Sequence, residues 1–161
     1  MNKISIIKAT KKHREFLIKS NSIIHEISEQ DCGSEFAKRI DVDYFCKTPK
    51  FYCLIAEYNN IPVGTILYSK MYWADDGEVL WVSQMFVEKE YRKHGVAIEL
   101  YKALKAFSPE ANVIACATGK GNATMNKVLK GIGFKIIDMN FFCKENIKRA
   151  LNIMERNDKI R

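Results

Sequence analysis

The chain has 161 residues, 47% of them hydrophobic and 28% charged, and its 26 basic and 19 acidic side chains leave a formal charge of +7. This length accommodates one domain with a substantial core, and the composition excludes general disorder. No apolar run approaches the roughly 20 residues that span a bilayer, and the first residues lack a long apolar segment with a cleavage site. We therefore expect a cytoplasmic protein with no membrane partner.

The excess positive charge lies in one half of the chain. Residues 1–80 carry 11 basic and 11 acidic side chains, whereas residues 81–161 carry 15 basic and 8 acidic ones. No recognised nucleic-acid motif accompanies this charge, so nucleic acid is not the expected partner. The five cysteines form no CxxC pair and no metal-ligand spacing, which indicates reduced structural thiols and no metal site.

The pattern of apolar residues predicts alternating strands and helices. The first half contains a strand, a helix capped by Thr10, a helix capped by Ser34 and a three-stranded meander, over residues 4–9, 10–27, 34–45, 51–58, 63–73 and 78–87. The second half contains a helix, a buried strand, a helix, a strand and a helical tail, over residues 96–107, 112–117, 122–129, 134–142 and 145–161. We expect one α/β domain over residues 1–144, and a tail that packs on it or lies at a homodimer interface.

The most informative segment is 85–97, where a strand runs into a basic loop that opens a helix. Free N–H groups at the start of a helix, together with the helix dipole, favour an anion. Gly95 and Ala97 leave room for a phosphate to reach these groups, and neighbouring basic side chains add donors. The segment therefore predicts a phosphate site, although an ordinary helix start with a solvated basic loop fits the same pattern.

Two motifs then resemble a known family. Arg92, Gly95 and Ala97 fill the fixed positions of R-x-x-G-x-A, and residues 122–134 contain an N…GF segment. Both motifs, and the order of the elements, resemble the GNAT N-acetyltransferase superfamily. The resemblance implies an α/β fold with a mixed, mostly antiparallel central sheet flanked by helices, and an acetyl-CoA-dependent N-acetyltransferase activity. Residues 51–91 are most similar to the diamine and polyamine branch, although Ser83-Gln84 replace the carboxylates of that branch.

The resemblance also implies which residues hold acetyl-CoA. The last strand residues would pair with the pantetheine arm through their main chain, the loop amides would hold the pyrophosphate, and an asparagine would hydrogen-bond the pantetheine. In the family this strand splays from its neighbour, often at a bulge. The expected coenzyme-binding residues are Met85, Phe86, Val87, Arg92, Lys93, His94, Gly95, Val96, Ala97 and Asn122.

Direct attack of an amine on the thioester needs a neutral amine and a proton for the departing thiolate. The usual groups are missing, because Leu129 occupies the position of the family's tyrosine acid, and Trp81 and Ser83 occupy the strand positions of its base. The candidates for the catalytic groups are therefore Ser83, which can hold a water, and Glu26, followed by His25 and Tyr72.

The acceptor is expected to be a primary amine of a small molecule or of a protein. Six acidic residues in 25–43, together with Asp75, Asp76 and Glu78, would favour a cationic amine, but they also fit a solvated helix face and a turn. The missing acid and base leave a second hypothesis open, a catalytically weak acyl-CoA-binding or regulatory module.

Overall fold

The computed structural model describes residues 4–28, 33–118 and 122–135, without the side chains of 26–28, 33 and 34. The chain divides into two compact units, residues 1–118 and residues 119–161. The first unit contains the whole described sheet, and the second contains helix α4 (Ala123–Gly131). The predicted strand at 134–142 falls almost entirely outside the described residues, as does the predicted tail at 145–161.

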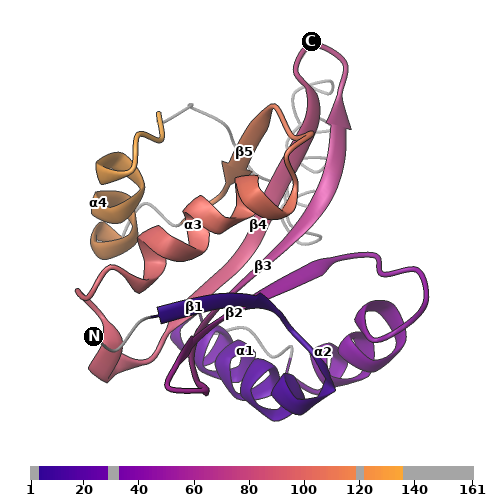
Figure 1. The fold of residues 1–161 in the computed structure, drawn as a ribbon, viewed down its shortest axis with the longest axis vertical. Helices are drawn as coiled ribbons and strands as arrows, with labels where there is room; N and C mark the ends of the chain where they lie inside the picture. Colours follow the sequence, from indigo (N-terminus) through magenta and orange to yellow (C-terminus); the bar gives the residue numbers. More distant parts are fainter. Residues whose placement is uncertain (1–3, 29–32, 119–121, 136–161) are drawn as a thin grey trace, which may run out of the picture. The chain divides into compact units, whose positions relative to one another are not determined.

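Five strands of the described residues form a single sheet in the order β1-β2-β3-β4-β5 (Figure 1). The first four strands pair antiparallel with their neighbours, and β5 runs parallel to β4. The bounds are β1 (Ile4–Lys8), β2 (Tyr52–Tyr58), β3 (Ile61–Trp73), β4 (Gly77–Val87) and β5 (Val113–Cys116). The mixed, mostly antiparallel sheet predicted from the sequence is confirmed.

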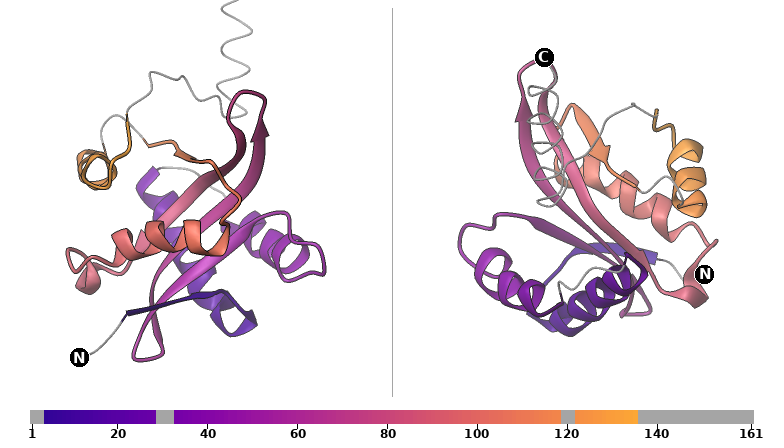
Figure 2. Two further views of the ribbon diagram at one scale, coloured as in Figure 1. Left: turned by 45° about the horizontal axis from the view of Figure 1, so that its top comes forward. Right: turned by 180° about the vertical axis from the view of Figure 1, so that it is seen from behind.

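Helices cover both faces of this sheet (Figure 2). The first face carries α1 (Arg14–Ser28) and α2 (Gly33–Arg39), and the opposite face carries α3 (Val96–Phe107). Short helical segments join them, at η1 (Lys11–His13), η2 (Ile40–Tyr44) and η3 (Lys89–Tyr91). None of the helices in the described parts of the chain is long and apolar enough to cross a membrane.

The sheet faces alternate as period-2 strands require. Cys53 and Ile55 of β2 pack in the core cluster beneath α1 and α2 together with Leu17 and Ile40, and all four are at most 1% exposed. Burial raises the pKa of the Cys53 thiol far above its usual range, so this cysteine behaves as a small apolar core residue. Cys53 is a free, buried thiol, which agrees with the expectation that the cysteines are reduced and structural.

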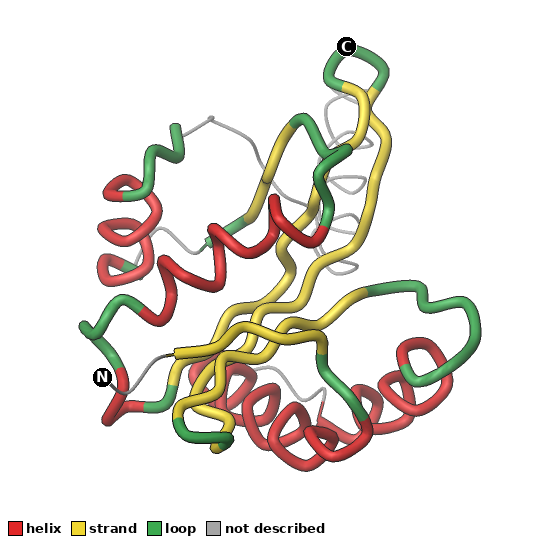
Figure 3. The backbone as a smooth tube through the Cα atoms, in the orientation of Figure 1, coloured by secondary structure: helices red, strands yellow, loops and turns green. Residues whose placement is uncertain are grey.

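A tight turn at Asn59-Asn60 joins β2 to β3 in the meander. Asn59 and Asn60 have φ values of 52° and 64°, the left-handed geometry that a two-residue hairpin loop requires and that asparagine tolerates. Beyond them β3 and β4 continue together as an extended hairpin (Figure 3). The second predicted helix differs in detail: α2 begins at Gly33, so Ser34 lies within it, and its end widens into the π-helical turn η2.

Candidate functional site

Strands β4 and β5 separate partway along their length. Their parallel register runs from Val79↔Val113 to Val82↔Cys116, and β5 ends there while β4 continues to Val87. At the same point the β3–β4 register jumps from Tyr68↔Val82 to Leu67↔Gln84, which leaves Ser83 as the extra residue of a β-bulge. The described residues therefore offer no strand partner to the β5-facing edge of residues 83–87, and this is the splay that the resemblance implied.

The register fixes which main-chain groups face this open edge. In an antiparallel pair, the N–H and C=O groups of alternate residues point to the partner strand. Glu88 N–H donates to Val63 O at 2.9 Å, so the main chain of Phe86, two residues earlier, also faces β3. Met85 and Val87 consequently direct their main-chain groups to the open edge. Of the three strand residues predicted to pair with the pantetheine, the geometry favours these two and not Phe86.

The strand continues into a loop that ends at the first turn of α3. Gly95 precedes this helix with φ +81° and ψ 0°, and it has no side chain to cap the helix. The first helical N–H groups, from Val96 onward, lack the intrahelical acceptors that later residues have. A Cβ built on Gly95 meets no atom within 4 Å, so open space adjoins these donors. These features are the ones that favour an anion at a helix start, and the phosphate site itself stays a prediction.

The loop itself is held in place by two contacts with the sheet. Arg92 Nε donates to Val87 O at 2.9 Å. The Tyr91 ring lies 5.5 Å from the ring of Tyr58 on β2, centroid to centroid. Lys93 is held in a left-handed conformation with φ 66°. Because the side chains of Arg92, Lys93 and His94 remain exposed, the loop presents basic groups from a fixed backbone.

On the face of β4 that carries α1, three polar side chains meet next to the bulge. Asn21 Nδ2 donates to Gln84 Oε1 at 3.0 Å, and Gln84 Nε2 lies 3.4 Å from His25 Nε2. Asn21 is 1% exposed, and its Oδ1 has no hydrogen-bond partner among the described residues. The sequence indicated His25 only as one candidate among several, and nothing in it indicated that Asn21 and Gln84 would join it.

The other predicted catalytic residues have different positions. Ser83 is exposed at the bulge, and its Oγ donates to Leu67 O at 3.3 Å. Glu26 follows His25 in α1, but its side chain lies outside the described residues. Tyr72 is 79% exposed and pairs with Glu78, five positions before Ser83, which places it about 16 Å away along the strand. Tyr72 is therefore too distant to act at the bulge.

On the opposite side of the splay, a tyrosine and a cysteine are in contact. Tyr101 of α3 is buried and hydrogen-bonds Cys116, the last residue of β5. Burial raises the pKa of the Cys116 thiol, and the hydrogen bond from Tyr101 partly offsets this by lowering it. Burial and the neighbouring sulfur also raise the pKa of Tyr101 well above its usual range. Cys116 is thus a mostly protonated thiol at the point where the strands part.

Two predicted residues belong to the second unit. Asn122 precedes α4, and its Oδ1 accepts a hydrogen bond from Met125 N–H at 3.1 Å, so it caps this helix. Its role toward the coenzyme stays a prediction. Leu129 is buried, with 7% of its surface exposed, and offers no proton to a thiolate.

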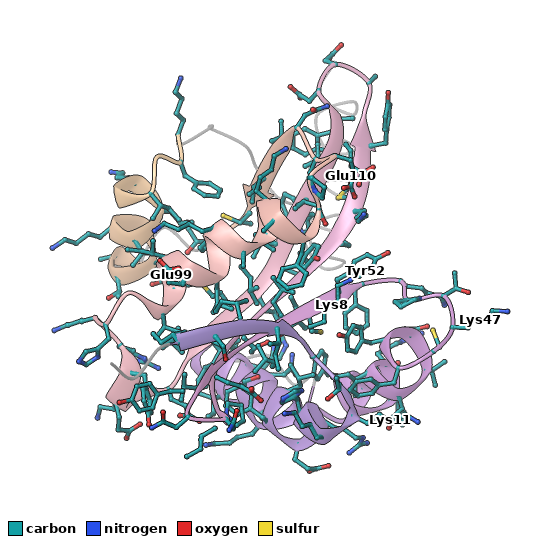
Figure 4. All side chains as sticks on the ribbon, in the orientation of Figure 1. Lys8, Lys11, Lys47, Tyr52, Glu99 and Glu110 are labelled. Carbon is teal, nitrogen blue, oxygen red and sulfur yellow. The ribbon has the colours of Figure 1, made fainter. Side chains whose placement is uncertain are left out.

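Four of the acids expected to favour a cationic amine pair with basic side chains in the described residues, namely Glu35, Asp41, Asp43 and Glu78. Asp41 pairs with Arg14 at 2.7 Å, and the hydrogen bond from Arg14 lowers the pKa of that carboxyl. Asp43 pairs with Lys50 and Arg39, which likewise lower its pKa. Figure 4 shows Glu110 beside the β3–β4 hairpin, where it pairs with Lys70, and Lys70 also lies 3.5 Å from Glu78. These ion pairs favour the interpretation as solvated helix and hairpin surfaces.

Comparison with known proteins agrees with this geometry. The model of the acetyltransferase (GNAT) family matches residues 21–134, which is most of the chain and includes the bulge, the loop and α3. The chain therefore belongs to the acetyltransferase (GNAT) family, and it is an acetyl-CoA-dependent N-acetyltransferase. A search of curated proteins gives no match.

Solved structures share the fold at low sequence identity. A possible acetyltransferase from Clostridium difficile 630 is 18% identical with a TM-score of 0.73, over 87% of this chain and 95% of that one. The aminoglycoside N-acetyltransferase AAC(6')-Iy in complex with CoA is 17% identical with a TM-score of 0.74, over 89% and 95%. An aminoglycoside acetyltransferase, meta-AAC0020, from an uncultured soil metagenomic sample, in complex with sisomicin, is 12% identical with a TM-score of 0.64, over 88% and 97%. These structures do not single out the diamine and polyamine branch.

Proposed function

We propose that this enzyme transfers the acetyl group of acetyl-CoA to a primary amine of a small molecule by direct attack on the thioester. One observation carries the proposal: the uncapped start of α3, with open space at Gly95, directly follows the edge of β4 that has no strand partner among the described residues. A ligand with a phosphate at one end and an amide-containing arm at the other fits such a continuous surface. Acetyl-CoA is such a ligand.

The residues present fit this coenzyme on physical grounds. The amides from Lys93 to Ala97 would hold the pyrophosphate, and a side chain at residue 95 would fill the space that the phosphate needs. The outward main-chain groups of Met85 and the N–H of Val87, whose oxygen accepts from Arg92, would pair with the amides of the arm. When bound, the coenzyme supplies an activated acetyl group on sulfur. The bulge at Ser83 would then adjoin the reacting carbon, because the arm follows β4 from its end toward the bulge.

The acceptor class rests on the structural neighbours. Two of the similar structures are aminoglycoside acetyltransferases, and one of them contains the aminoglycoside sisomicin. We therefore place small polyamino compounds first among the acceptors, ahead of protein amines. The side chains of α1 that approach the bulge are polar, which suits hydrogen bonding to an amino group as well as to a hydroxyl.

An assay of thiol release tests the proposal. The enzyme is mixed with acetyl-CoA and, separately, with an aminoglycoside, a linear polyamine and a lysine-containing peptide, and mass spectrometry identifies any N-acetyl product. We expect release of CoA that depends on a small-molecule amine and yields one acetyl group on nitrogen. Turnover with the peptide alone would contradict the acceptor class, and no release with any amine would contradict the activity.

A further inference from the structure

The chemistry at the bulge requires a group that removes a proton from the acceptor, because an alkylammonium is not a nucleophile. Neither position where the family's base is expected carries one, since they hold Trp81 and Ser83. The nearest side chain of the described residues with a suitable nitrogen is His25, on α1. Its contact with Gln84 places it one residue from Ser83 along β4.

We propose that His25 accepts the proton of the acceptor amine, and that Gln84 and Asn21 position it. This inference rests on the proposed function and names the base for the same site. The order of the contacts supports it: Asn21 Nδ2 donates to Gln84 Oε1, which turns the Gln84 Nε2 donor toward His25 Nε2. A donor facing Nε2 selects the tautomer in which the ring proton is on Nδ1 and the lone pair is on Nε2.

The contact between Gln84 and His25 is long enough for a ligand to replace it. At 3.4 Å, the Gln84 Nε2 to His25 Nε2 contact is longer than a strong hydrogen bond, so an ammonium group can replace it at little cost. The buried Oδ1 of Asn21 adds an acceptor beside Gln84 that has no partner among the described residues. A buried acceptor of this kind is costly unless a water or a ligand N–H satisfies it. Both observations point to an N–H-bearing ligand at this place.

The proton balance of the step is complete. One proton of the acceptor ammonium moves to His25 Nε2, and the freed lone pair of nitrogen forms the new C–N bond with the acetyl carbon. The C–S bond breaks, its electron pair leaves on sulfur, and the sulfur takes up the second amine proton to give the free thiol. His25 then returns its proton to water, so no other reactant is needed.

The test combines substitution with rescue and spectroscopy. His25→Gln keeps a hydrogen-bonding side chain but cannot accept a proton, and we expect kcat to fall about 100-fold or more, with binding of acetyl-CoA unchanged by calorimetry. His25→Ala should lose activity similarly and regain part of it when free imidazole is added. Ser22→Ala, three residues earlier on α1, serves as the matched control and should retain kcat.

The positioning role of Gln84 is tested separately, by the tautomer of His25. Nitrogen-15 NMR of the histidine rings should show the Nδ1–H tautomer for His25 in the wild type and a mixture of tautomers in Gln84→Met. If His25→Gln keeps kcat, or if imidazole rescues nothing in His25→Ala, His25 is not the proton acceptor. An Nε2–H tautomer in the wild type would overturn the role of Gln84. A wild type that neither binds acetyl-CoA nor turns over would instead remove the proposed function, so the two failures are distinguishable.

Discussion

Gly64 of β3 lies directly beneath Val96, the first residue of α3, and a Cβ at position 64 would be only 3.1 Å from Val96 Cγ1. The same Cβ would lie 3.2 Å from the main-chain oxygen of Phe86, which is fixed in the sheet. The absence of a side chain at residue 64 therefore sets how closely the start of α3 approaches the strand that opens. The anion site depends on this close packing.

Gly64→Ala should disturb this packing. We expect a loss of about 1–3 kcal/mol in the free energy of unfolding, because overpacking forces atoms off their preferred positions. Acetyl-CoA affinity should also fall, since the displaced group is the N-terminal turn of α3. Urea unfolding and calorimetry measure the two effects. Gly131→Ala, where an added Cβ meets no atom within 4 Å, is the control and should change neither.

Arg92 is expected to act partly through the loop backbone. Its Nε–H donates to Val87 O, so lysine at this position would keep the charge and lose the anchor. We expect Arg92→Lys to weaken acetyl-CoA binding about tenfold, which corresponds to one charge-assisted hydrogen bond. Arg92→Gln should bind more weakly still and with a shallower dependence on salt. Wild-type affinity in Arg92→Lys would show that only the charge matters.

The reactivity of the Cys116 thiol can be used to probe the end of β5, where its pairing with β4 stops. Tyr101→Phe removes the hydrogen bond that lowers the pKa of Cys116, so the thiol should ionise less at a given pH and react more slowly with iodoacetamide. Acetyl-CoA should protect Cys116 in the wild type, because the arm would run beside it. Peptide mapping follows the reaction, with the exposed Cys46 as internal control. Protection of both cysteines, or of neither, would argue against this location of the arm.

A buried carboxylate away from the site, Glu57, should govern the response to acid. His13 Nε2 lies 2.9 Å from Glu57 Oε1, and the hydrogen bonds from His13 and then Lys12 lower the pKa of Glu57. A carboxyl with a lowered pKa in the folded state adds stability above its unfolded pKa, near 4.3, and loses it as the pH falls through the folded value. Glu57→Gln should therefore be less stable than wild type at pH 7.

The same variant supplies the check on this assignment. Urea unfolding from pH 7 down to pH 3 should show the difference between wild type and Glu57→Gln shrinking as the carboxylate is protonated. A difference that stays constant over this range would mean that the charge of Glu57 contributes nothing.

The sequence predicted the sheet and the loop well because their signals are local. Turn residues such as Asn59-Asn60, and a glycine before a helix, each have one main physical explanation. The proposed phosphate site lies within a motif of a few consecutive residues. The polar group beside the bulge was not predictable in this way. Asn21 and Gln84 are 63 residues apart, and only the packing of α1 on β4 joins them. Neither residue type is unusual in a helix or a strand, so no sequence pattern marks the contact.

The acidic segment 25–43 is the opposite case. Its clustered carboxylates are conspicuous in the sequence, but ion pairing on the surface explains those that the structure describes. The carboxylates of Asp41 and Asp43 stand out in the sequence, but each pairs with a basic side chain. Asp41 pairs with Arg14 and Asp43 pairs with Lys50. Charge counted along a sequence does not show which charges are paired, because pairing depends on the tertiary contacts. The excess positive charge of residues 81–161 is better explained, since Arg92 and Lys93 lie exposed on the loop that would hold phosphates.

The most direct test of the account is the binding of acetyl-CoA to two variants of Gly95. Gly95→Glu and Gly95→Gln share the strain of a left-handed position and nearly the same volume, so only the charge differs. Calorimetry should show a fall in affinity of about 100-fold or more for Gly95→Glu and a smaller fall for Gly95→Gln. Acetyl-pantetheine, which lacks the phosphates, should bind both variants equally. Equal affinity of the two variants for acetyl-CoA would contradict the assignment of the phosphate site to the start of α3.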